Sequence, residues 1–252
     1  MRWRLDLEYD GREFAGWQFQ PGARTVQGVV EEALGRFLQH PVRVHAAGRT
    51  DAGVHAHQQV VRFDTERVRS PRSVVGALGA LLPADVSCWA ATPAAADFDP
   101  RRWPHRKLYR YRFLDRAARS SLRQGRVWHV KRVMNVDAMD AAAGFLVGTY
   151  DFSSFRAAGC SSVHPTRTVA ACRVDRVADE VHLEIEGTGF LRHMVRILAG
   201  TLNDVGTGRR PSTWLRDVVA ARRRDAAGRT APPGGLSLVS VRYEAAAVLT
   251  GE

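Results

Sequence analysis

The chain has 252 residues and carries 37 lysine and arginine side chains against 26 acidic ones, a formal net charge of +11. Hydrophobic residues make up 45% of it, which argues against a disordered chain, and the length suits one large domain or two small ones. No apolar run approaches the roughly 20 residues of a membrane span, and the first residues show no charged-then-apolar pattern, so we expect no export. Three widely spaced cysteines indicate neither a disulfide framework nor a paired-cysteine metal site, so we expect a cytoplasmic protein.

The first hundred residues alternate between strand and helix patterns. Residues 2–9 alternate apolar and polar positions, which predicts a strand. Apolar residues at helical spacing predict a helix up to Leu38, with Thr25 as its N-cap. The other predicted elements are strands at 42–46, 58–63 and 86–91 and a helix at 73–82. This β-α-β-β-α-β order is typical of the split βαβ arrangement.

Residues 47–56 form the most unusual loop of the chain. Gly48 and Gly53 permit a tight backbone, while Asp51 places a carboxylate two residues from Arg49. A structural turn with an ion pair inside the loop would explain this pattern. A functional acid is the alternative, because catalytic residues concentrate on loops. The basic segment described below indicates a site for a polyanion, and an acid in such a site needs a reason.

Three histidines lie near this loop, and they leave a metal site open as an alternative: His45, His55 and His57. Residues two apart on a strand share one face, so a ligand pair is geometrically possible. Their spacing matches no standard zinc pattern, and we therefore predict no metal.

Residues 101–132 hold twelve basic residues and one acid, Asp115. The net charge of this segment is therefore +11, the same as that of the whole chain. The other 220 residues therefore sum to zero. Within this segment residues 107–112 alternate aromatic and basic side chains, so a strand there would show rings on one face and cations on the other. Such a segment indicates a surface for a polyanion, with an ordinary solvated face as the alternative.

The second half shows a similar order of elements. Strands are predicted at 107–114, 169–174, 181–186 and 236–243, and helices at 135–146, 190–202 and 214–221. In the helix at 190–202, Arg192 and Arg196 would share one face, either exposed or paired with a carboxylate. We predict an α+β fold of two similar ferredoxin-like halves, residues 1–100 and 101–252. Their strands would form one continuous central sheet with a cleft between the halves.

Several motifs of the chain, taken together, resemble those of the TruA-type tRNA pseudouridine synthases. The loop at 47–56 matches the catalytic loop of that family nearly residue for residue. Further matches follow in the family's order: Phe98 with Arg101, the run 109–111, Gly148 with Asp151, Phe152 and Phe155, the run 190–196, the run 200–202, and the run 232–236.

The resemblance implies roles for single residues. Asp51 would be the catalytic carboxylate and Arg196 its ion-pair partner. Tyr109 would lie beside the flipped uracil, Arg49 would hold the flipped nucleotide, and Leu236 would line the pocket. The residues leave open whether Asp51 attacks the sugar, attacks the base or abstracts a proton.

The resemblance also implies the reaction and the partners. Uridines of the tRNA anticodon stem-loop would be isomerised to pseudouridine after being flipped from the stem, without cofactor, metal or energy source. The enzyme would be a homodimer that binds tRNA. Four basic residues would contact the RNA backbone: Arg101, Arg106, Lys107 and Arg110. A non-catalytic RNA-binding protein of the same fold and a metal-dependent nuclease remain the alternatives.

Overall fold

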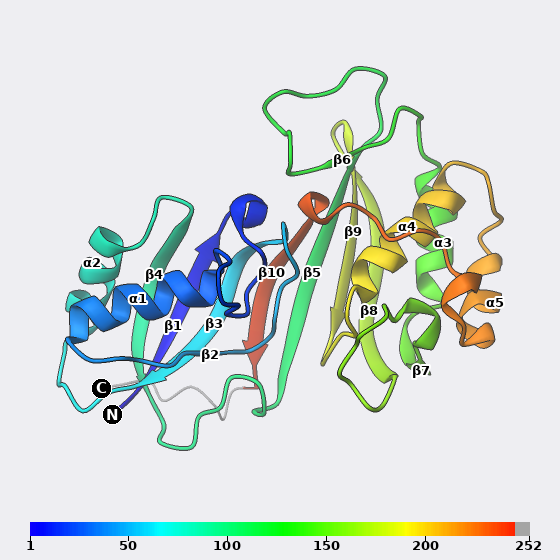
Figure 1. Cartoon of the computed structure of the whole chain (residues 1–252). Helices are drawn as coiled ribbons and strands as arrows, with labels where there is room; N and C mark the ends of the chain where they lie inside the picture. Colours follow the sequence, from blue (N-terminus) through cyan, green and yellow to red (C-terminus); the bar gives the residue numbers. More distant parts are fainter. Residues whose placement is uncertain (245–252) are drawn as a thin grey trace. The chain divides into compact units, whose positions relative to one another are not determined.

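A computed structural model of the chain describes residues 1–244 (Figure 1). The chain forms two compact units. Unit 1 comprises Met1–His105 together with the residues from Leu238 onward, and unit 2 comprises Arg106–Ser237. Each unit combines strands with helices, so the predicted α+β class is confirmed. The predicted second half ran to residue 252, and its last eight residues lie outside the described part.

Unit 1 is built on a sheet in the order β4-β1-β3-β10, in which β1 runs antiparallel to both of its neighbours. Alternate residues of β1 point into the core, because Trp3, Leu5, Leu7 and Tyr9 are all buried, as their spacing predicts. The elements are β1 (Arg2–Tyr9), α1 (Val26–Leu38), β2 (His45–Ala46) beside β3 (His55–Asp64), α2 (Pro71–Leu81), β4 (Val86–Ala94) and β10 (Leu236–Tyr243).

The ends of α1 follow from local chemistry. Thr25 is the N-cap, as predicted, and its hydroxyl accepts a hydrogen bond from the Gly28 amide at 3.2 Å. Gln39 ends the helix in the left-handed conformation at φ 58°. These two residues set the length of the helix that precedes the Asp51 loop.

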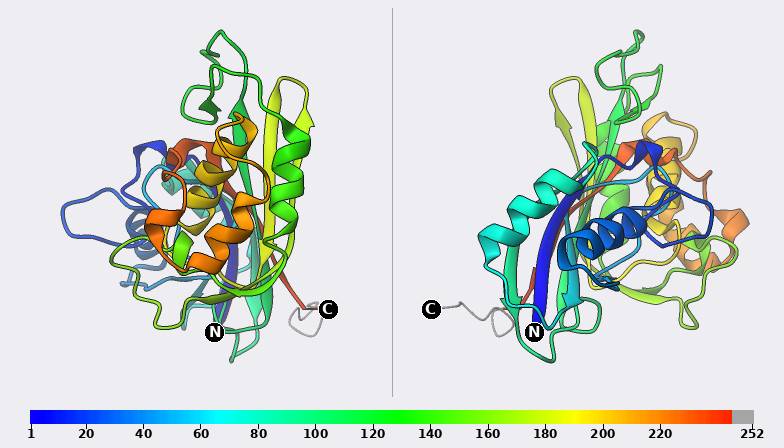
Figure 2. Two further views of the ribbon diagram at one scale, coloured as in Figure 1. Left: turned by 90° about the vertical axis from the view of Figure 1, so that its right-hand side faces the viewer. Right: turned by 60° about the vertical axis from the view of Figure 1, so that its left-hand side comes forward.

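Unit 2 has the strand order β5-β9-β8-β7, with β6 beside β5. Helix α3 packs against β8 and α4, and the left view of Figure 2 shows the helices of this unit over one face of its strands. The elements are β5 (His105–Leu114), β6 (Trp128–His129), α3 (Val136–Gly144), β7 (Gly148–Asp151), β8 (Thr166–Val177), β9 (Glu180–Gly187), α4 (Met194–Gly206) and α5 (Trp214–Ala221). Within residues 1–244 no helix is both long and apolar enough to cross a membrane.

The start of α4 differs from the prediction. The helix begins at Met194, because His193 adopts a left-handed conformation at φ 59° and the Arg192 carbonyl accepts a hydrogen bond from the Ala157 amide at 3.1 Å. Arg192 therefore precedes the helix. The prediction that Arg192 and Arg196 share one helix face is wrong, and the two side chains have different surroundings.

Candidate active site

The loop that carries Asp51 is held by backbone contacts to residues 14–17 of unit 1. The Trp17 amide donates to the Thr50 carbonyl at 3.0 Å, and the Gly53 amide donates to the Phe14 carbonyl at 3.3 Å. The loop closes on itself where the Val54 amide donates to the Asp51 carbonyl at 3.1 Å. Asp51 is thus placed at the start of a tight turn whose flanks are both fixed.

Gly16 makes this close approach possible. Its φ is 100°, and a Cβ atom there would lie 2.9 Å from the Thr50 carbonyl oxygen and 3.1 Å from the Ala52 amide nitrogen. Any larger residue would be strained and would push the loop away. The sequence gives no sign of this contact, because Gly16 lies more than thirty residues before the loop.

Two buried polar side chains anchor the start of the loop. The Tyr9 hydroxyl lies 2.8 Å from the Thr50 hydroxyl, and the Gln59 side-chain amide donates to the Gly48 carbonyl at 2.8 Å. Burial raises the pKa of Tyr9 to about 12, although the hydrogen bonds with Thr50 and Gln59 oppose that shift. Tyr9 therefore keeps its proton at neutral pH and serves as a neutral hydrogen-bonding partner.

The two charged residues of the loop differ in exposure. Asp51 is half-buried, whereas Arg49 is exposed and makes no hydrogen bond or ion pair with any described residue. The structural alternative considered above, an ion pair between Arg49 and Asp51 inside the loop, is therefore wrong. The guanidinium of Arg49 is available to an outside anion.

Of the three nearby histidines, His55 has a structural role. It is buried, its Nδ1 accepts a hydrogen bond from the Gly11 amide at 3.1 Å, and the same atom lies 3.2 Å from the Asp10 carboxylate. His45 and His57 are exposed. Residues 1–244 contain no group of three or more side chains placed to hold a metal ion, so nothing in their geometry supports the metal alternative.

The predicted residues of unit 2 lie on three different segments. Tyr109 on β5 is buried, and its ring packs edge-on against Phe190, with ring centroids 5.1 Å apart and planes at 80°. Phe190 was part of a matching motif but was not predicted as a site residue. An aromatic wall of two rings is a suitable surface for holding a base by stacking.

Arg196 lies in the first turn of α4 and is fixed by the segment at 228–231. Its Nε donates to the Ala231 carbonyl at 2.9 Å, while its own carbonyl accepts from the Ala231 amide at 3.0 Å. The segment lies so close to α4 that a Cβ atom on Gly200 would overlap the Arg229 carbonyl. These contacts orient the Arg196 guanidinium from its Nε end.

Leu236 is buried at the start of β10, and Tyr111 fixes the chain that leads into it. The Tyr111 hydroxyl donates to the Pro232 carbonyl at 2.8 Å. Burial raises the pKa of Tyr111 well above its ordinary value, while Arg196 and Arg229 oppose the shift, so the hydroxyl remains a donor. Arg196 and Leu236 are thus fixed through one segment, at residues 231–236, whereas Tyr109 is fixed on β5.

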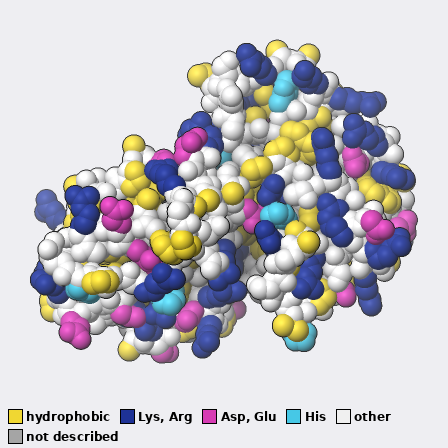
Figure 3. Space-filling view, in the orientation of Figure 1, with side chains coloured by type: hydrophobic (Ala, Val, Ile, Leu, Met, Phe, Trp, Pro, Cys, Tyr) yellow, Lys and Arg dark blue, Asp and Glu magenta, His cyan; other side chains and the backbone are white. Residues whose placement is uncertain are grey.

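The four predicted backbone-binding residues are not equivalent. Arg110 forms an ion pair with Glu184 at 2.6 Å, and Arg106 lies 4.0 Å from Glu186. Lys107 is buried, whereas Arg101 is exposed and makes no ion pair within the described residues. Figure 3 shows basic side chains spread widely over the surface of unit 2, with acidic ones among them.

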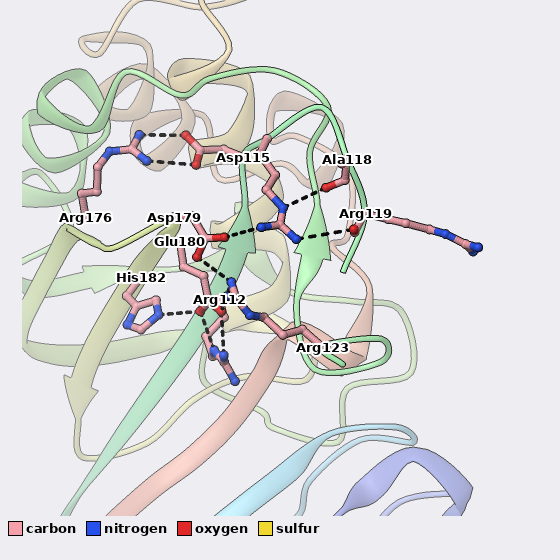
Figure 4. A network of polar contacts seen from close by, with 10 residues as sticks. Arg112, Asp115, Ala118, Arg119, Arg123, Arg176, Asp179, Glu180 and His182 are labelled. Carbon is pink, nitrogen blue, oxygen red and sulfur yellow. Dashed lines mark hydrogen bonds and ion pairs between the residues drawn. The ribbon is translucent and has the colours of Figure 1, made fainter. Parts of the chain in front are cut away.

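Further arginines of the segment 101–132 form ion pairs with Asp179, in the turn between β8 and β9, and with Glu180, the first residue of β9 (Figure 4). We call this the Glu180 network. Glu180 accepts from Arg112 at 2.7 Å and also contacts Arg123 and His182, while Asp179 pairs with Arg116 and Arg123. Beside it, Asp115 forms a two-pronged ion pair with Arg176.

These ion pairs reduce the number of basic residues that the predicted polyanion surface can offer to a ligand. Much of the charge of segment 101–132 is neutralised within unit 2 by Asp179, Glu180, Glu184 and Glu186. Within the part of the chain that the structure describes, five basic residues of the segment make no ion pair: Arg101, Arg102, Arg119, Lys131 and Arg132. The segment is a partly self-neutralised structure and not a uniform basic surface.

A loop-borne aspartate, packed aromatic rings and arginines that make no ion pair with a described residue fit an enzyme that acts on RNA. The sequence model of a family described as tRNA pseudouridine synthase matches residues 7–101 and 142–244. The chain belongs to the tRNA pseudouridine synthase family, and the prediction that it is an isomerase of this class is confirmed.

Curated relatives are similar over nearly the whole chain. The tRNA pseudouridine synthase A of Myxococcus xanthus is 49% identical over 243 residues, which are 96% of this chain and 92% of that protein. The protein of the same name from Methylobacterium nodulans is 45% identical over 98% of both chains. That of Rhodospirillum rubrum is 46% identical, over 96% of this chain and 88% of its own length.

Proposed function

We propose that the protein isomerises uridines of the tRNA anticodon stem-loop to pseudouridine, with Asp51 as the catalytic carboxylate. The observation that carries the proposal is the construction of the Asp51 loop. Backbone bonds to Phe14 and Trp17 and the close packing of Gly16 fix the turn on which Asp51 lies. A carboxylate held in a rigid turn is pre-organised for reaction, whereas simple RNA binding has no use for one.

The reaction balances without any other reagent. The bond between the sugar C1′ and the base N1 breaks, the detached uracil turns, and C1′ joins C5. The proton on C5 is lost and N1 gains one, so the product is an isomer. A carboxylate can attack the sugar, attack the base or abstract a proton, and each of these steps ends with release of the C5 proton.

The other predicted residues have roles that fit their surroundings. Arg196, oriented through Ala231, would pair with Asp51 and complement the negative charge of the carboxylate. The rings of Tyr109 and Phe190 would confine the detached uracil, with Leu236 as an aliphatic wall. Arg49, exposed and unpaired within the described residues, would take the phosphate of the flipped nucleotide.

The target uridine is reached by flipping it out of the stem into a positively charged cleft. Flipping costs a few kcal/mol, and contacts to the RNA backbone offset that cost. Arg101 fits this role best among the four predicted residues, since Arg110 is occupied by Glu184. A cytoplasmic homodimer that binds one tRNA across both subunits completes the proposal.

The test is an Asp51→Asn variant, which keeps the size of the side chain and removes its charge. We expect pseudouridine formation to fall by about 10²–10⁴-fold or more, measured as tritium release from tRNA labelled at C5 of uridine, while tRNA affinity is retained. Asp97→Asn is the matched control, because Asp97 is an exposed acid of unit 1 without an ion pair in the described residues, and it should be fully active.

Mapping the modified positions in the same tRNA tests the anticodon stem-loop. Normal tritium release from Asp51→Asn would overturn the assignment of the catalytic residue. Wild-type protein that binds tRNA and forms no pseudouridine would favour the non-catalytic alternative, and RNA cleavage that EDTA abolishes would favour the nuclease.

A further inference from the structure

Three arginines of unit 2 hold the loop that joins η2 (Ser153–Phe155) to β8, and we call them the Arg156 cluster: Arg156, Arg167 and Arg192. Arg156 donates to the carbonyls of Cys160 and Ser162 at 3.0 and 2.6 Å. Arg167 donates to the Ser162 hydroxyl at 2.6 Å and to the His164 and Thr166 carbonyls. Arg192 donates to the carbonyls of Ala158 and Gly159 at 3.2 and 3.3 Å.

None of the three guanidinium groups forms an ion pair with a described carboxylate. The sequence explains why, because no acidic residue occurs between Asp151 and Asp175 or between Glu186 and Asp204. Neutral carbonyls leave the three positive charges uncompensated. Arg156 and Arg192 each use one terminal nitrogen of the guanidinium in these bonds, so further N–H donors remain for an anion.

The thiol of Cys160 reports the local potential. Burial by itself would raise the pKa of Cys160, but amide groups of Arg192 and Ser162 and the guanidinium of Arg156 outweigh burial and lower it. A site that favours a thiolate favours other anions as well. Burial also lowers the pKa of Arg167. The neighbouring Cys160 opposes this shift, and the charge of Arg156 adds to it, so the two guanidinium groups act on each other.

Holding a loop does not explain this arrangement. Uncharged donors would bind the same carbonyls without bringing the charges of Arg156 and Arg167 close together, and carboxylate partners would offset those charges. A multiply charged anion would offset them as well. The cluster lies next to the rings of Tyr109 and Phe190, because Arg192 follows Phe190 by two residues. The Arg192 carbonyl accepts a hydrogen bond from the Ala157 amide, which connects it to the loop.

We propose that the Arg156 cluster binds phosphate groups of the tRNA, on nucleotides next to the uridine held at Tyr109 and Phe190. The proposal rests on the proposed function for the identity of the RNA. Phosphate oxygens match the planar donor geometry of guanidinium groups, and Arg192, the exposed member, makes the first contact.

Cys160 provides a direct test in the native enzyme. It is half-buried, whereas Cys88 and Cys172 are buried, and burial raises the pKa of both of those thiols. An uncharged maleimide should therefore modify Cys160 first. We expect saturating unmodified tRNA to slow this reaction at least about fivefold, while inorganic phosphate at the same phosphate concentration does not slow it. Unchanged labelling of tRNA-bound enzyme, or equal protection by inorganic phosphate, would overturn the proposal.

Variants separate charge from loop structure. Arg192→Gln should weaken tRNA binding by roughly 3–10-fold, and Arg192→Lys, which keeps the charge, should recover most of that loss. Arg72→Gln removes an exposed arginine of unit 1 that makes no ion pair with a described residue, and it is the matched control. Equal effects of Arg192→Gln and Arg72→Gln would contradict a specific site. These readouts measure binding only, so they remain valid if Asp51→Asn proves active and the proposed function fails.

Discussion

Two arginine-rich regions of unit 2 use the same side chain in opposite ways. In the Glu180 network, Arg112, Arg116 and Arg123 form ion pairs with carboxylates at the start of β9 and in the turn before it (Figure 4). In the Arg156 cluster, all three arginines donate hydrogen bonds to backbone carbonyls, and Arg167 also donates to the Ser162 hydroxyl. The first region is close to neutral, and the second retains its charge.

The difference lies in where the acids occur. The segment 101–132 is the most basic part of the sequence, yet the four acids of residues 179–186 lie opposite it on β9 and the adjoining turn. The loop of the Arg156 cluster holds fewer basic residues and no acids. If the Arg156 cluster binds RNA as proposed, a stretch without acids indicates an RNA site better than the density of arginines does.

The largest effect that would test this contrast is on stability. Glu180→Gln removes the charge on which Arg112, Arg123 and His182 converge, and the carboxylate it replaces is only 7% exposed. We expect the free energy of unfolding to fall by about 2–3 kcal/mol, measured by urea denaturation, with little change in tRNA affinity. Glu32→Gln, at an exposed glutamate of α1, is the control. A large loss of tRNA affinity in a stably folded Glu180→Gln would place the network in the RNA-binding surface.

The pH dependence of stability gives the next largest effect. Burial raises the pKa of Glu180, but hydrogen bonds from Arg112 and His182 outweigh it and hold that pKa below its usual range. The pKa of Asp115 is lowered in the same way by Arg176 against burial. A folded-state pKa below the unfolded value of about 4 contributes stability above that pH, and the contribution is lost as pH falls through the folded pKa.

The stability difference between wild type and Glu180→Gln should therefore shrink as pH falls from about 6 to 3. Arg192→Gln breaks no ion pair, so its difference from wild type should stay constant over the same range. Urea midpoints at four pH values measure both. A difference for Glu180→Gln that does not change with pH would show that the Glu180 charge contributes nothing.

Local sequence signals predicted most of the elements of the fold. The alternation of apolar and polar residues predicted β1, and the capping residue Thr25 predicted the start of α1. The helical spacing of apolar residues predicted α5 (Trp214–Ala221) with its observed bounds. The start of α4 could not be predicted, because it depends on the left-handed His193 and on a bond from Ala157, which is far away in the sequence. Short strands such as β7 also escaped, since four residues carry little periodicity.

The candidate site divides in the same way. Asp51 and Arg49 stand out in one short motif, so the sequence and its resemblance to a family single them out. Tyr9, Gly16 and Gln59, which fix the loop, come from separate elements and show no local pattern. The ion pairs of the Glu180 network join residues as far as 68 positions apart, so no count along the chain could show which arginines are neutralised.

The smallest predicted effect concerns salt. The affinity for tRNA should fall as salt concentration rises. Each phosphate contact that is lost should make the negative slope of log affinity against log salt concentration shallower by about 0.7–0.9. Arg192→Gln should show this reduction, because only one nitrogen of its guanidinium is engaged within the described part of the chain. Arg116→Gln should not, because all three nitrogens of Arg116 bind Asp179, Ala118 or Arg119. Titrations of tRNA at four salt concentrations measure both slopes. A reduced slope for Arg116→Gln and an unchanged slope for Arg192→Gln would reverse the roles of the two regions, since the neutralised network would then be the one that contacts RNA.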